Sequence, residues 1–336
     1  MEKHPVTIKD IAKRLNVSVS TVSRALRNVS DINPATKEAV LQLAEELNYE
    51  PNYMAQSLVN KKTRIIGVIV PAIHSNYFSE ALSGMTDVAN ENNYYLMFCQ
   101  SNETFSQEIS SMKKLVACNV DGLLLSISKE TKDPAEFEKI REKGTPIVMF
   151  DRILPDFCCN KVIVDEYEGA FKAVEHLIKR GCRRIVHIAG PAGLSISENR
   201  MQGYLDALKK YKLPMDEKLI LRCKAFEDDA LPAIKKIAHL RPLPDGLFAI
   251  NDRSAVLAIK YLRSHNISVP EAIKVAGFND DPISEAVEPS LTTVMQPGYE
   301  VGKLAMGILI DEIKNKPNGN QTIRLRTKLI IRDSSK

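Results

Sequence analysis

The sequence predicts a small all-α head followed by a larger α/β body of two doubly wound parallel-sheet lobes. The first fifty residues contain three short helical patterns and no strand pattern. From Ile65 onward, apolar runs of strand length alternate with amphipathic helical patterns, which is typical of parallel sheets covered on both faces. About ten such runs are more than one open sheet usually holds, so we expect two lobes.

The composition indicates an ordinary water-soluble protein of two-domain size. The chain has 336 residues, of which 44% are hydrophobic and 26% are charged. No apolar run approaches the roughly 18 residues of a membrane span, and Lys3, Lys9 and Asp10 interrupt any signal peptide. We therefore expect a cytoplasmic protein with no membrane partner. The six cysteines lack a Cys-x-x-Cys pattern and are expected to be reduced, although the adjacent Cys158 and Cys159 leave redox sensing open.

The positive charge is concentrated at the N-terminus. The net charge is +4, and the first thirty residues, with six basic and two acidic side chains, account for all of it. This asymmetry predicts a head that binds a polyanion, joined to a neutral body. A merely solvated helix face is the alternative that charge alone leaves open.

Three helix starts organise the head, which we place at residues 1–50. Thr7 opens the first helix, with Asp10 as its capping-box partner. Ser18 caps the second, and Asn33-Pro34 supplies the N-cap and first position of the third. The apolar residues expected on the buried sides are Ile8, Ile11, Ala12, Leu15, Val22, Ala25, Leu26, Ala39, Val40, Leu43, Ala44 and Leu47.

Residues 6–27 form a helix-turn-helix pattern. Ala12 is small where two helices must cross closely, and Val17 and Val22 fill the crossing. The second helix then exposes short polar groups and long donors that can reach base edges and phosphates in a major groove. These residues are Val19, Ser20, Thr21, Ser23, Arg24 and Arg27. A three-helix protein-binding module is the alternative.

The body reads as strands separated by helices, and ligands in such folds bind at the carboxyl ends of the strands. The predicted strands are residues 65–70, 94–100, 122–126, 146–150, 162–164, 184–189, 219–223, 246–250, 274–277 and 293–296. Enzyme motifs are absent from the sequence: there is no Gly-x-Gly-x-x-Gly, P-loop, Gly-x-Ser-x-Gly or His-Glu-x-x-His. The six histidines show no metal-ligand spacing, and His187 reads as a packed strand residue. We expect no catalytic residue, metal or cofactor.

Over essentially its whole length, the sequence resembles the lactose-repressor/galactose-repressor (LacI/GalR) family of bacterial transcription regulators. The motifs that carry the resemblance are Val6-Thr7-Ile8-Lys9-Asp10-Ile11-Ala12, Val17-Ser18, Thr21-Val22-Ser23-Arg24, Leu47-Asn48-Tyr49-x-Pro51-Asn52, Ala55-Gln56-Ser57-Leu58, Ile66-Gly67-Val68-Ile69, Val120-Asp121-Gly122-Leu123, Phe150-Asp151-Arg152, Val164-Asp165, Gly190-Pro191, Arg200-x-x-Gly203-Tyr204, Asn251-Asp252, Gly277-Phe278 and Leu291-Thr292-Thr293-Val294-x-Gln296-Pro297.

The resemblance implies a domain plan and partners. It places a hinge helix and linker at 51–62 and a periplasmic-binding-protein-like body for effector binding and dimerisation at 63–336. The chain would cross between the lobes three times, so that the N-lobe takes about 63–163 and 293–324 and the C-lobe about 164–292 and 325–336. It further implies a homodimer that binds a pseudo-palindromic double-stranded operator and responds to a small polar effector, most simply a sugar or sugar derivative.

For DNA, the resemblance adds Thr7 and Ser18 in the head and a set of hinge residues. In the family, two leucines at the position of Leu58 wedge into the minor groove at the operator centre, which kinks the DNA. Packing of Leu58 on protein is the alternative. The hinge residues implied at the DNA are Asn52, Tyr53, Ala55, Gln56 and Leu58.

For the effector, the resemblance implies contacts from Tyr77, Phe78, Asp151, Asp165, Arg200, Phe226, Asn251, Asp252 and Asn279. Phe78 also fits a helix core stripe, and Arg200 could instead form a surface ion pair. Asn279 stands where the family usually has Asp, which puts the usual sugar-hydroxyl geometry in doubt. Leu194 and Ile196 replace polar groups of purine-sensing members, which disfavours a purine.

These expectations combine into a homodimeric, allosteric, ligand-responsive repressor. Two rivals remain open. One is a member of the same family whose effector is a protein or a phosphorylated cofactor, and the other is a carbohydrate-binding or uptake protein. No leucine heptad follows Arg332, which favours a dimer over a tetramer.

Overall fold

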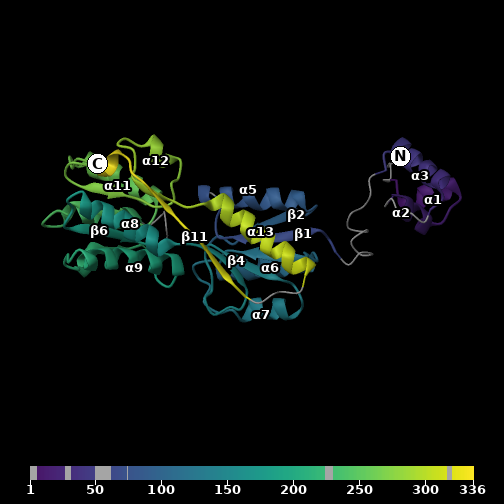
Figure 1. Ribbon diagram of the computed structural model, residues 1–336, viewed down its shortest axis with the longest axis horizontal. Coiled ribbons are helices and arrows are strands. Elements are labelled where there is room, and N and C mark those ends of the chain that lie inside the picture. Colours follow the sequence, from purple (N-terminus) through teal and green to yellow (C-terminus); the bar gives the residue numbers. More distant parts are fainter. Residues whose placement is uncertain (1–5, 27–31, 50–61, 74, 224–229, 316–319) are drawn as a thin grey trace. The chain divides into compact units, whose positions relative to one another are not determined.

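A computed structural model of the chain describes residues 6–26, 32–49, 62–73, 75–223, 230–315 and 320–336. The chain divides into two separate units, Met1–Thr63 and Arg64–Lys336, which we call the head and the body (Figure 1). The predicted fold class is confirmed: the head is helical and the body is built on two parallel sheets. In the described parts of the chain, no helix is long and apolar enough to cross a membrane.

The head packs three helices around one small core. They are α1 (Ile8–Leu15), α2 (Val19–Leu26) and α3 (Pro34–Glu46). Ile11, Val22 and Val40, one from each helix, are fully buried. The predicted start of α3 is confirmed, because the Asn33 side chain accepts a hydrogen bond from the backbone N–H of Ala35 at 2.9 Å. This cap satisfies one of the N–H groups that a helix start leaves without a partner.

The first lobe of the body is a six-stranded parallel sheet in the order β11-β5-β4-β3-β1-β2. Helices α5 and α13 cover one face, and α6 and α7 cover the other (Figure 1). Its elements are β1 (Ile65–Val70), α5 (Asn76–Glu91), β2 (Tyr95–Gln100), α6 (Phe105–Ala117), β3 (Gly122–Leu125), α7 (Ala135–Glu142), β4 (Ile147–Phe150), β5 (Asn160–Val164), α13 (Gly298–Lys314) and β11 (Thr322–Leu325).

The second lobe is a four-stranded parallel sheet in the order β7-β6-β8-β9. Helices α8 and α9 pack on one face, and α10 and α11 on the other. Its elements are α8 (Glu166–Lys179), β6 (Ile185–Ala189), α9 (Ser195–Lys210), a 3-10 turn (Glu217–Leu219), β7 (Ile220–Arg222), α10 (Ala230–His239), β8 (Gly246–Ala249), α11 (Asp252–Ser264), β9 (Lys274–Ala276), α12 (Ile283–Ala286) and a 3-10 turn (Asp333–Ser335).

The chain passes between the two sheets at three places. The first lies between β5 and α8, and the second lies between β10 (Thr293–Met295) and α13. The third lies between β11 and β12 (Lys328–Ile330), and β12 pairs antiparallel with β10. Strands β11 and β12 have no counterpart among the ten predicted strands. The carboxyl ends of β1, β3, β4 and β5 and those of β6, β8 and β9 therefore lead into the loops and helix starts from which the candidate site is built.

Helices α5 and α13 touch through glycines. A Cβ atom at Gly302 would lie 1.9 Å from the carbonyl oxygen of Ala81, and one at Gly84 would lie 2.1 Å from that of Tyr299. Both distances are far shorter than any van der Waals contact, so the backbones can approach this closely only where no side chain is present. The contact holds the first turn of α5, which carries Tyr77 and Phe78, against the start of α13.

Candidate functional site

The outward side of α2 carries most of the residues predicted at DNA. Ser18, Val19, Ser20 and Arg24 are exposed, and Thr21 and Ser23 are half-buried. The inward residues of α2, Val22 and Ala25, are buried in the head core. Val19, at the first position of the helix, is an apolar residue that is 42% exposed. Arg27 lies outside the described residues.

The start of α2 is fixed by hydroxyl groups. The predicted cap is confirmed, because Ser18 Oγ accepts a hydrogen bond from the backbone N–H of Thr21 at 3.0 Å. The same oxygen lies 2.7 Å from the hydroxyl of Ser20 and 2.8 Å from that of Thr21. This cluster orders three of the predicted DNA-binding side chains before any ligand is present.

Thr7 and Asp10 fix the start of α1. The Asp10 carboxylate accepts hydrogen bonds from the backbone N–H of Thr7 at 2.8 Å and from its hydroxyl at 2.7 Å. These hydrogen bonds hold the pKa of Asp10 below its usual value. Thr7 is exposed, but its hydroxyl proton is already donated within the head. At DNA it can therefore offer its oxygen as an acceptor more readily than its proton.

In the body, the predicted effector residues follow the carboxyl ends of strands from both sheets. Tyr77 and Phe78 begin α5 after β1, Asp151 follows β4, Asp165 follows β5, Arg200 is on α9 after β6, Asn251 and Asp252 follow β8, and Asn279 follows β9. Because parallel strands end at one edge of their sheet, the topology collects these positions at the two facing edges. Phe226 lies outside the described residues, as do Asn52, Tyr53, Ala55, Gln56 and Leu58 of the predicted hinge.

Arg200 is buried rather than at the surface, since only 3% of the residue is exposed. Its Nε donates to Glu166 Oε2 at 2.6 Å, and one terminal nitrogen donates to the Ile250 carbonyl and lies 3.5 Å from Asn279 Oδ1. The guanidinium carbon lies 3.7 Å from the centre of the Phe278 ring. The surface ion pair considered as the alternative for Arg200 is therefore wrong in its location: a pair exists, but both partners are buried.

Tyr77 and Asp151 bring a hydroxyl and a carboxylate to the same region. Tyr77 is 5% exposed, and its hydroxyl has no hydrogen-bond partner in the described structure. Burial, aided by the charges of Asp151 and Glu166, raises the pKa of Tyr77 well above its usual value. Burial also raises the pKa of Asp151 to about 6, against the opposing charge of Arg152. Asp151 accepts a hydrogen bond from Ser126 Oγ at 3.2 Å and has a left-handed backbone with φ of 60°.

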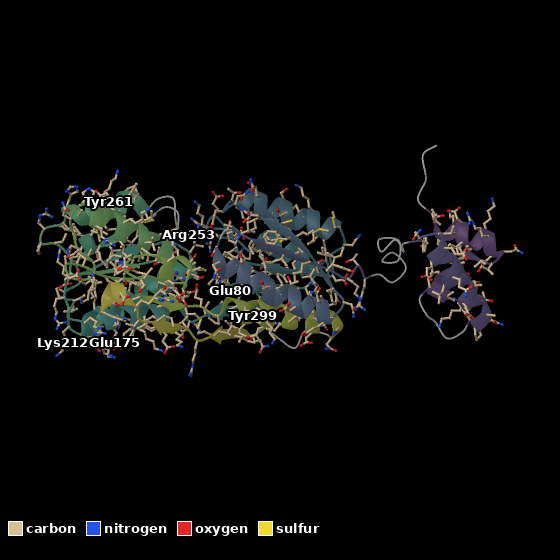
Figure 2. The ribbon with its side chains drawn as sticks, turned by 90° about the horizontal axis from the view of Figure 1, so that it is seen from above. Glu80, Glu175, Lys212, Arg253, Tyr261 and Tyr299 are labelled. Atoms are coloured by element: carbon tan, nitrogen blue, oxygen red, sulfur yellow. The ribbon has the colours of Figure 1, made fainter. Side chains whose placement is uncertain are left out.

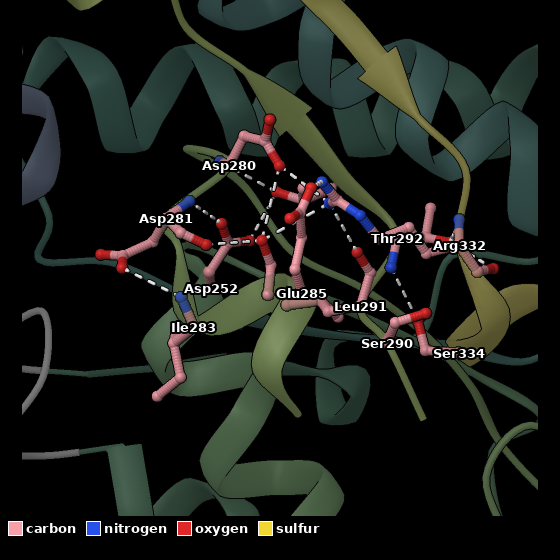
Figure 3. Close-up of polar contacts among 12 residues, drawn as sticks. Asp252, Asp280, Asp281, Ile283, Glu285, Ser290, Leu291, Thr292, Arg332 and Ser334 are labelled. Atoms are coloured by element: carbon pink, nitrogen blue, oxygen red, sulfur yellow. Dashed lines mark hydrogen bonds and ion pairs between the residues drawn. The ribbon is translucent and has the colours of Figure 1, made fainter. Parts of the chain in front are cut away.

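Asp252 is a buried residue that connects α11 to the segment after β9 by hydrogen bonds. It accepts a hydrogen bond from the hydroxyl of Thr293. It also accepts one from the backbone N–H of Asp281 at 2.8 Å (Figure 3). Burial raises its pKa to about 7. Arg332, near the C-terminus, forms an ion pair with Asp280 at 2.8 Å (Figure 3). The segment that carries Asn279 is thus tied to α11 on one side and to the C-terminal segment on the other.

Three predicted effector residues also have structural contacts. Asp165 caps α8 and Asn251 caps α11, each accepting a hydrogen bond at 2.9 Å from the backbone N–H three residues later. Phe78 is 4% exposed and packs edge-to-face on Phe150, with ring centres 6.3 Å apart. The core packing considered for Phe78 is therefore present in the structure.

Glu80 on α5 and Arg253 on α11 lie toward the junction of the two lobes (Figure 2). Burial, and then the charges of Asp280 and Asp281, raise the pKa of Glu80. Arg253 Nε lies 3.7 Å from Asp281 Oδ2. Acidic groups thus gather on both sides of the junction. Within the described residues, no group of three or more His, Cys, Asp or Glu side chains could hold a metal ion.

Comparisons with known proteins match both units. The family described as "Bacterial regulatory proteins, lacI family" matches residues 7–52, and the "Periplasmic binding protein-like domain" matches residues 174–335. The ribose operon repressor of Halalkalibacterium halodurans is 31% identical over 330 residues, which cover 98% of this chain and 97% of that protein. The HTH-type transcriptional repressor CytR of Escherichia coli K12 is 31% identical, over 98% of this chain and 96% of that protein. The chain belongs to the lacI family of bacterial regulatory proteins.

This lacI-family protein also shares its fold with solved structures. A structure described as "transcriptional regulator CelR-cellobiose complex" is 27% identical with a TM-score of 0.75, over 98% of this chain and 99% of that one. The lac repressor dimer bound to operator and the anti-inducer ONPF is 22% identical with a TM-score of 0.87, over 99% of each chain, which shows the shared fold. The resemblance seen in the motifs is confirmed, and the lacI-family chain is a ligand-responsive, DNA-binding transcription regulator of the repressor class. Its named relatives are regulators rather than enzymes.

Sequence reasoning missed two residues that the lacI-family body places beside Arg200. Glu166 bonds Arg200 through one carboxylate oxygen and accepts from Gln296 Nε2 at 2.8 Å through the other. Glu166 directly follows Asp165, so it reads as an ordinary acidic residue in a first helical turn. Its one distinguishing sign is an acidic side chain on the buried face of an amphipathic helix, which only becomes informative once Arg200 is opposite it.

Proposed function

We propose that this chain binds a pseudo-palindromic operator as a homodimer and changes its operator affinity when a sugar-like effector binds to the body. Chromosomal DNA is in the cytoplasm, so the protein would act there. The observation that carries the DNA half of the proposal is the ordered, outward N-terminal half of α2. Its serine and threonine hydroxyls are positioned by Ser18, while Val22 and Ala25 anchor the helix from behind.

In this proposal, α2 lies in the major groove. Its N-terminal residues face base edges, and Arg24 and Arg27 reach bases or phosphates. Val19 can contact a thymine methyl group, since it is apolar and exposed. Thr7 and Ser18, at the starts of α1 and α2, hold these helix starts beside the DNA backbone. The hinge at 51–62, with Leu58 as a minor-groove wedge, remains a prediction from the family resemblance.

The effector half of the proposal rests on the polar groups at the strand ends. Tyr77 offers a buried hydroxyl without a partner, Asp151 offers a carboxylate, and Asn279 offers an amide. Such groups recognise hydroxyls by hydrogen bonds, and a ligand would satisfy the Tyr77 hydroxyl that the protein leaves unbonded. Relatives described as a ribose operon repressor and as a CelR–cellobiose complex support a sugar.

We also propose the lobe boundaries expected from the family, at about 63–163 with 293–324 and about 164–292 with 325–336. The membership of β1–β5 and β11 in one sheet and of β6–β9 in the other supports them. Effector binding would then change the relative orientation of two lobes joined by three crossings. A coupling of roughly 1–3 kcal/mol, or about 5- to 150-fold in operator affinity, is typical of such systems.

The test begins with selection of operator fragments from genomic DNA by the full-length chain. Fluorescence anisotropy then measures binding of the selected fragment with and without each of a panel of neutral mono- and disaccharides. We expect at least one sugar to change operator affinity about fivefold or more. Failure to select any specific fragment would contradict the DNA half of the proposal. Specific DNA binding that no sugar or other small polar metabolite alters would contradict the effector half.

A further inference from the structure

We propose that Glu166 determines which effectors the body accepts: by neutralising and orienting the Arg200 guanidinium, it makes the site selective for uncharged, hydroxyl-bearing ligands over phosphate- or carboxylate-bearing ones. The inference rests on the proposed function in one respect only, that the effector binds beside Arg200. Glu166 is not among the residues predicted to bind DNA or effector, and the proposal assigns it a role in the specificity of the effector site.

The geometry of Arg200 shows how little of its charge is available. Nε is bonded to Glu166 at 2.6 Å, one terminal nitrogen is bonded to the Ile250 carbonyl, and the flat face lies on Phe278. An arginine binds an anion best through two parallel N–H groups. Here Nε is already used by Glu166, so the Nε side of the fork is closed to a ligand. The second terminal nitrogen has no hydrogen-bond partner among the described residues, and it can donate to one ligand oxygen.

Glu166 is itself held in place from both sides. Its other carboxylate oxygen accepts from Gln296 Nε2 at 2.8 Å, and all three residues are at most 4% exposed. Glu166 begins α8 directly after the first crossing, and Gln296 lies in the second crossing, between β10 and α13. The two side chains therefore come from different crossings. A carboxylate held by two buried donors cannot swing away to make room for a competing anion without leaving Arg200 and Gln296 unbonded, which is costly in a buried site.

The other charges nearby also disfavour an anion. Asp151 is a buried carboxylate, and its ion-pair partner Arg152, with Nε 3.9 Å from Asp151 Oδ2, is also bonded through one terminal nitrogen to both carboxylate oxygens of Glu103, at 2.7 and 2.8 Å. A phosphate beside Arg200 would face Asp151 and Glu166 with no uncommitted guanidinium fork to compensate. A sugar hydroxyl meets no such penalty, since it can donate to Asp151 and accept from Tyr77 or Arg200.

The experiment measures thermal stability of the full-length chain in inorganic phosphate against sodium chloride of equal ionic strength. Three proteins are compared: wild type, Glu166→Gln, and Glu168→Gln as the matched control. Glu168 lies on the same helical turn and loses the same charge, but it pairs with Lys172 at 39% side-chain exposure and does not contact Arg200. Neither wild type nor the control should respond specifically to phosphate. Glu166→Gln leaves Arg200 without its carboxylate, and it should show an apparent affinity for phosphate at least tenfold above the other two.

A double variant, Glu166→Gln with Arg200→Gln, removes both charges and should lose the phosphate response. Equal responses of Glu166→Gln and Glu168→Gln would overturn the proposal, and so would a phosphate response that persists in the double variant. Recovery of folded Glu166→Gln in phosphate but not in chloride supports the proposal, whereas a folded Glu166→Gln that gains no stability from phosphate contradicts the proposal. None of these outcomes depends on operator binding or on a sugar, so the proposed function can fail or hold independently.

Discussion

The head and the body place their polar groups in opposite ways. The head carries them on the exposed side of the eight-residue helix α2, fixed by hydrogen bonds between residues two or three positions apart. The body buries Arg200, Glu166 and Gln296, which lie up to 130 positions apart in the chain. A local cluster can be inferred from sequence and adds little to stability, whereas a distant buried cluster needs the whole fold and makes stability depend on it.

The largest difference between the two regions should appear when a buried charge loses its partner. Arg200→Met leaves Glu166 buried without a counter-charge and should destabilise the body by about 3–5 kcal/mol. Lys172→Met is the control, since it breaks the exposed pair with Glu168 at 2.7 Å and should cost under about 1 kcal/mol. Calorimetry on the full chain measures both. Similar small losses for the two variants would show that the Arg200 pair is not the buried, coupled unit described above.

The next effect tests whether the body depends on close helix contact. Gly302→Ala places a methyl group 1.9 Å from the Ala81 carbonyl oxygen and should destabilise the body by roughly 1–3 kcal/mol as α13 moves away from α5. Gly307 is on the same helix with nothing within 4 Å of an added Cβ. Gly307→Ala should therefore stabilise by about 0.5–1 kcal/mol through the better helix propensity of alanine. Denaturant unfolding compares them, and effects of the same sign would contradict the α5–α13 contact.

A smaller effect should distinguish the regions by pH. Glu108, buried beside Ser128 and Thr131, has its pKa raised to about 7, chiefly by burial. Its folded pKa exceeds the unfolded value, so the folded state binds the extra proton, and stability at this site falls as pH rises from about 4.5 to 7. The slope is at most about 1.4 kcal/mol per pH unit. Glu108→Gln cannot titrate and should lack this slope, so the difference in stability between variant and wild type should change across that pH range. A difference that stays constant from about pH 4.5 to 7 would contradict the prediction.

The head should respond in the opposite direction, because the pKa of Asp10 is lowered by its hydrogen bonds to Thr7. The contribution of Asp10 is then fully present above its unfolded pKa near 4 and is lost as pH falls through the lower folded value. Asp10→Asn lacks this contribution, so its head should be less stable than that of wild type at neutral pH, and the difference should shrink as the pH falls below about 4. Circular dichroism at acid pH follows the head helices.

Contacts between residues close in the chain could be predicted from the sequence, and contacts between distant residues could not. The starts of α2 and α3 were visible in Ser18 and in Asn33-Pro34, because a cap and its helix are adjacent in the chain. Strands β1 to β9 were visible as apolar runs of strand length. Strand β11 was not, because it lies at the sheet edge with alternating exposure and carries Arg324. The partnership of Arg200 with Glu166 was not visible either, since no periodicity links positions 34 residues apart.

The central claim is that α2 of this lacI-family protein reads operator DNA, and the salt dependence of binding tests it most directly. Binding of the full chain to its selected operator would be measured by anisotropy across a salt series, for wild type, Arg24→Ala and Lys114→Ala. Lys114 is an exposed lysine on α6 of the body, so Lys114→Ala removes the same charge outside the head.

Arg24→Ala should weaken specific binding by about 1–3 kcal/mol if Arg24 contacts a base, or lower the salt slope by about one if Arg24 contacts a phosphate. Lys114→Ala should do neither. Operator affinity and salt slope that are the same in all three proteins would contradict the assignment of α2 as the DNA-reading helix.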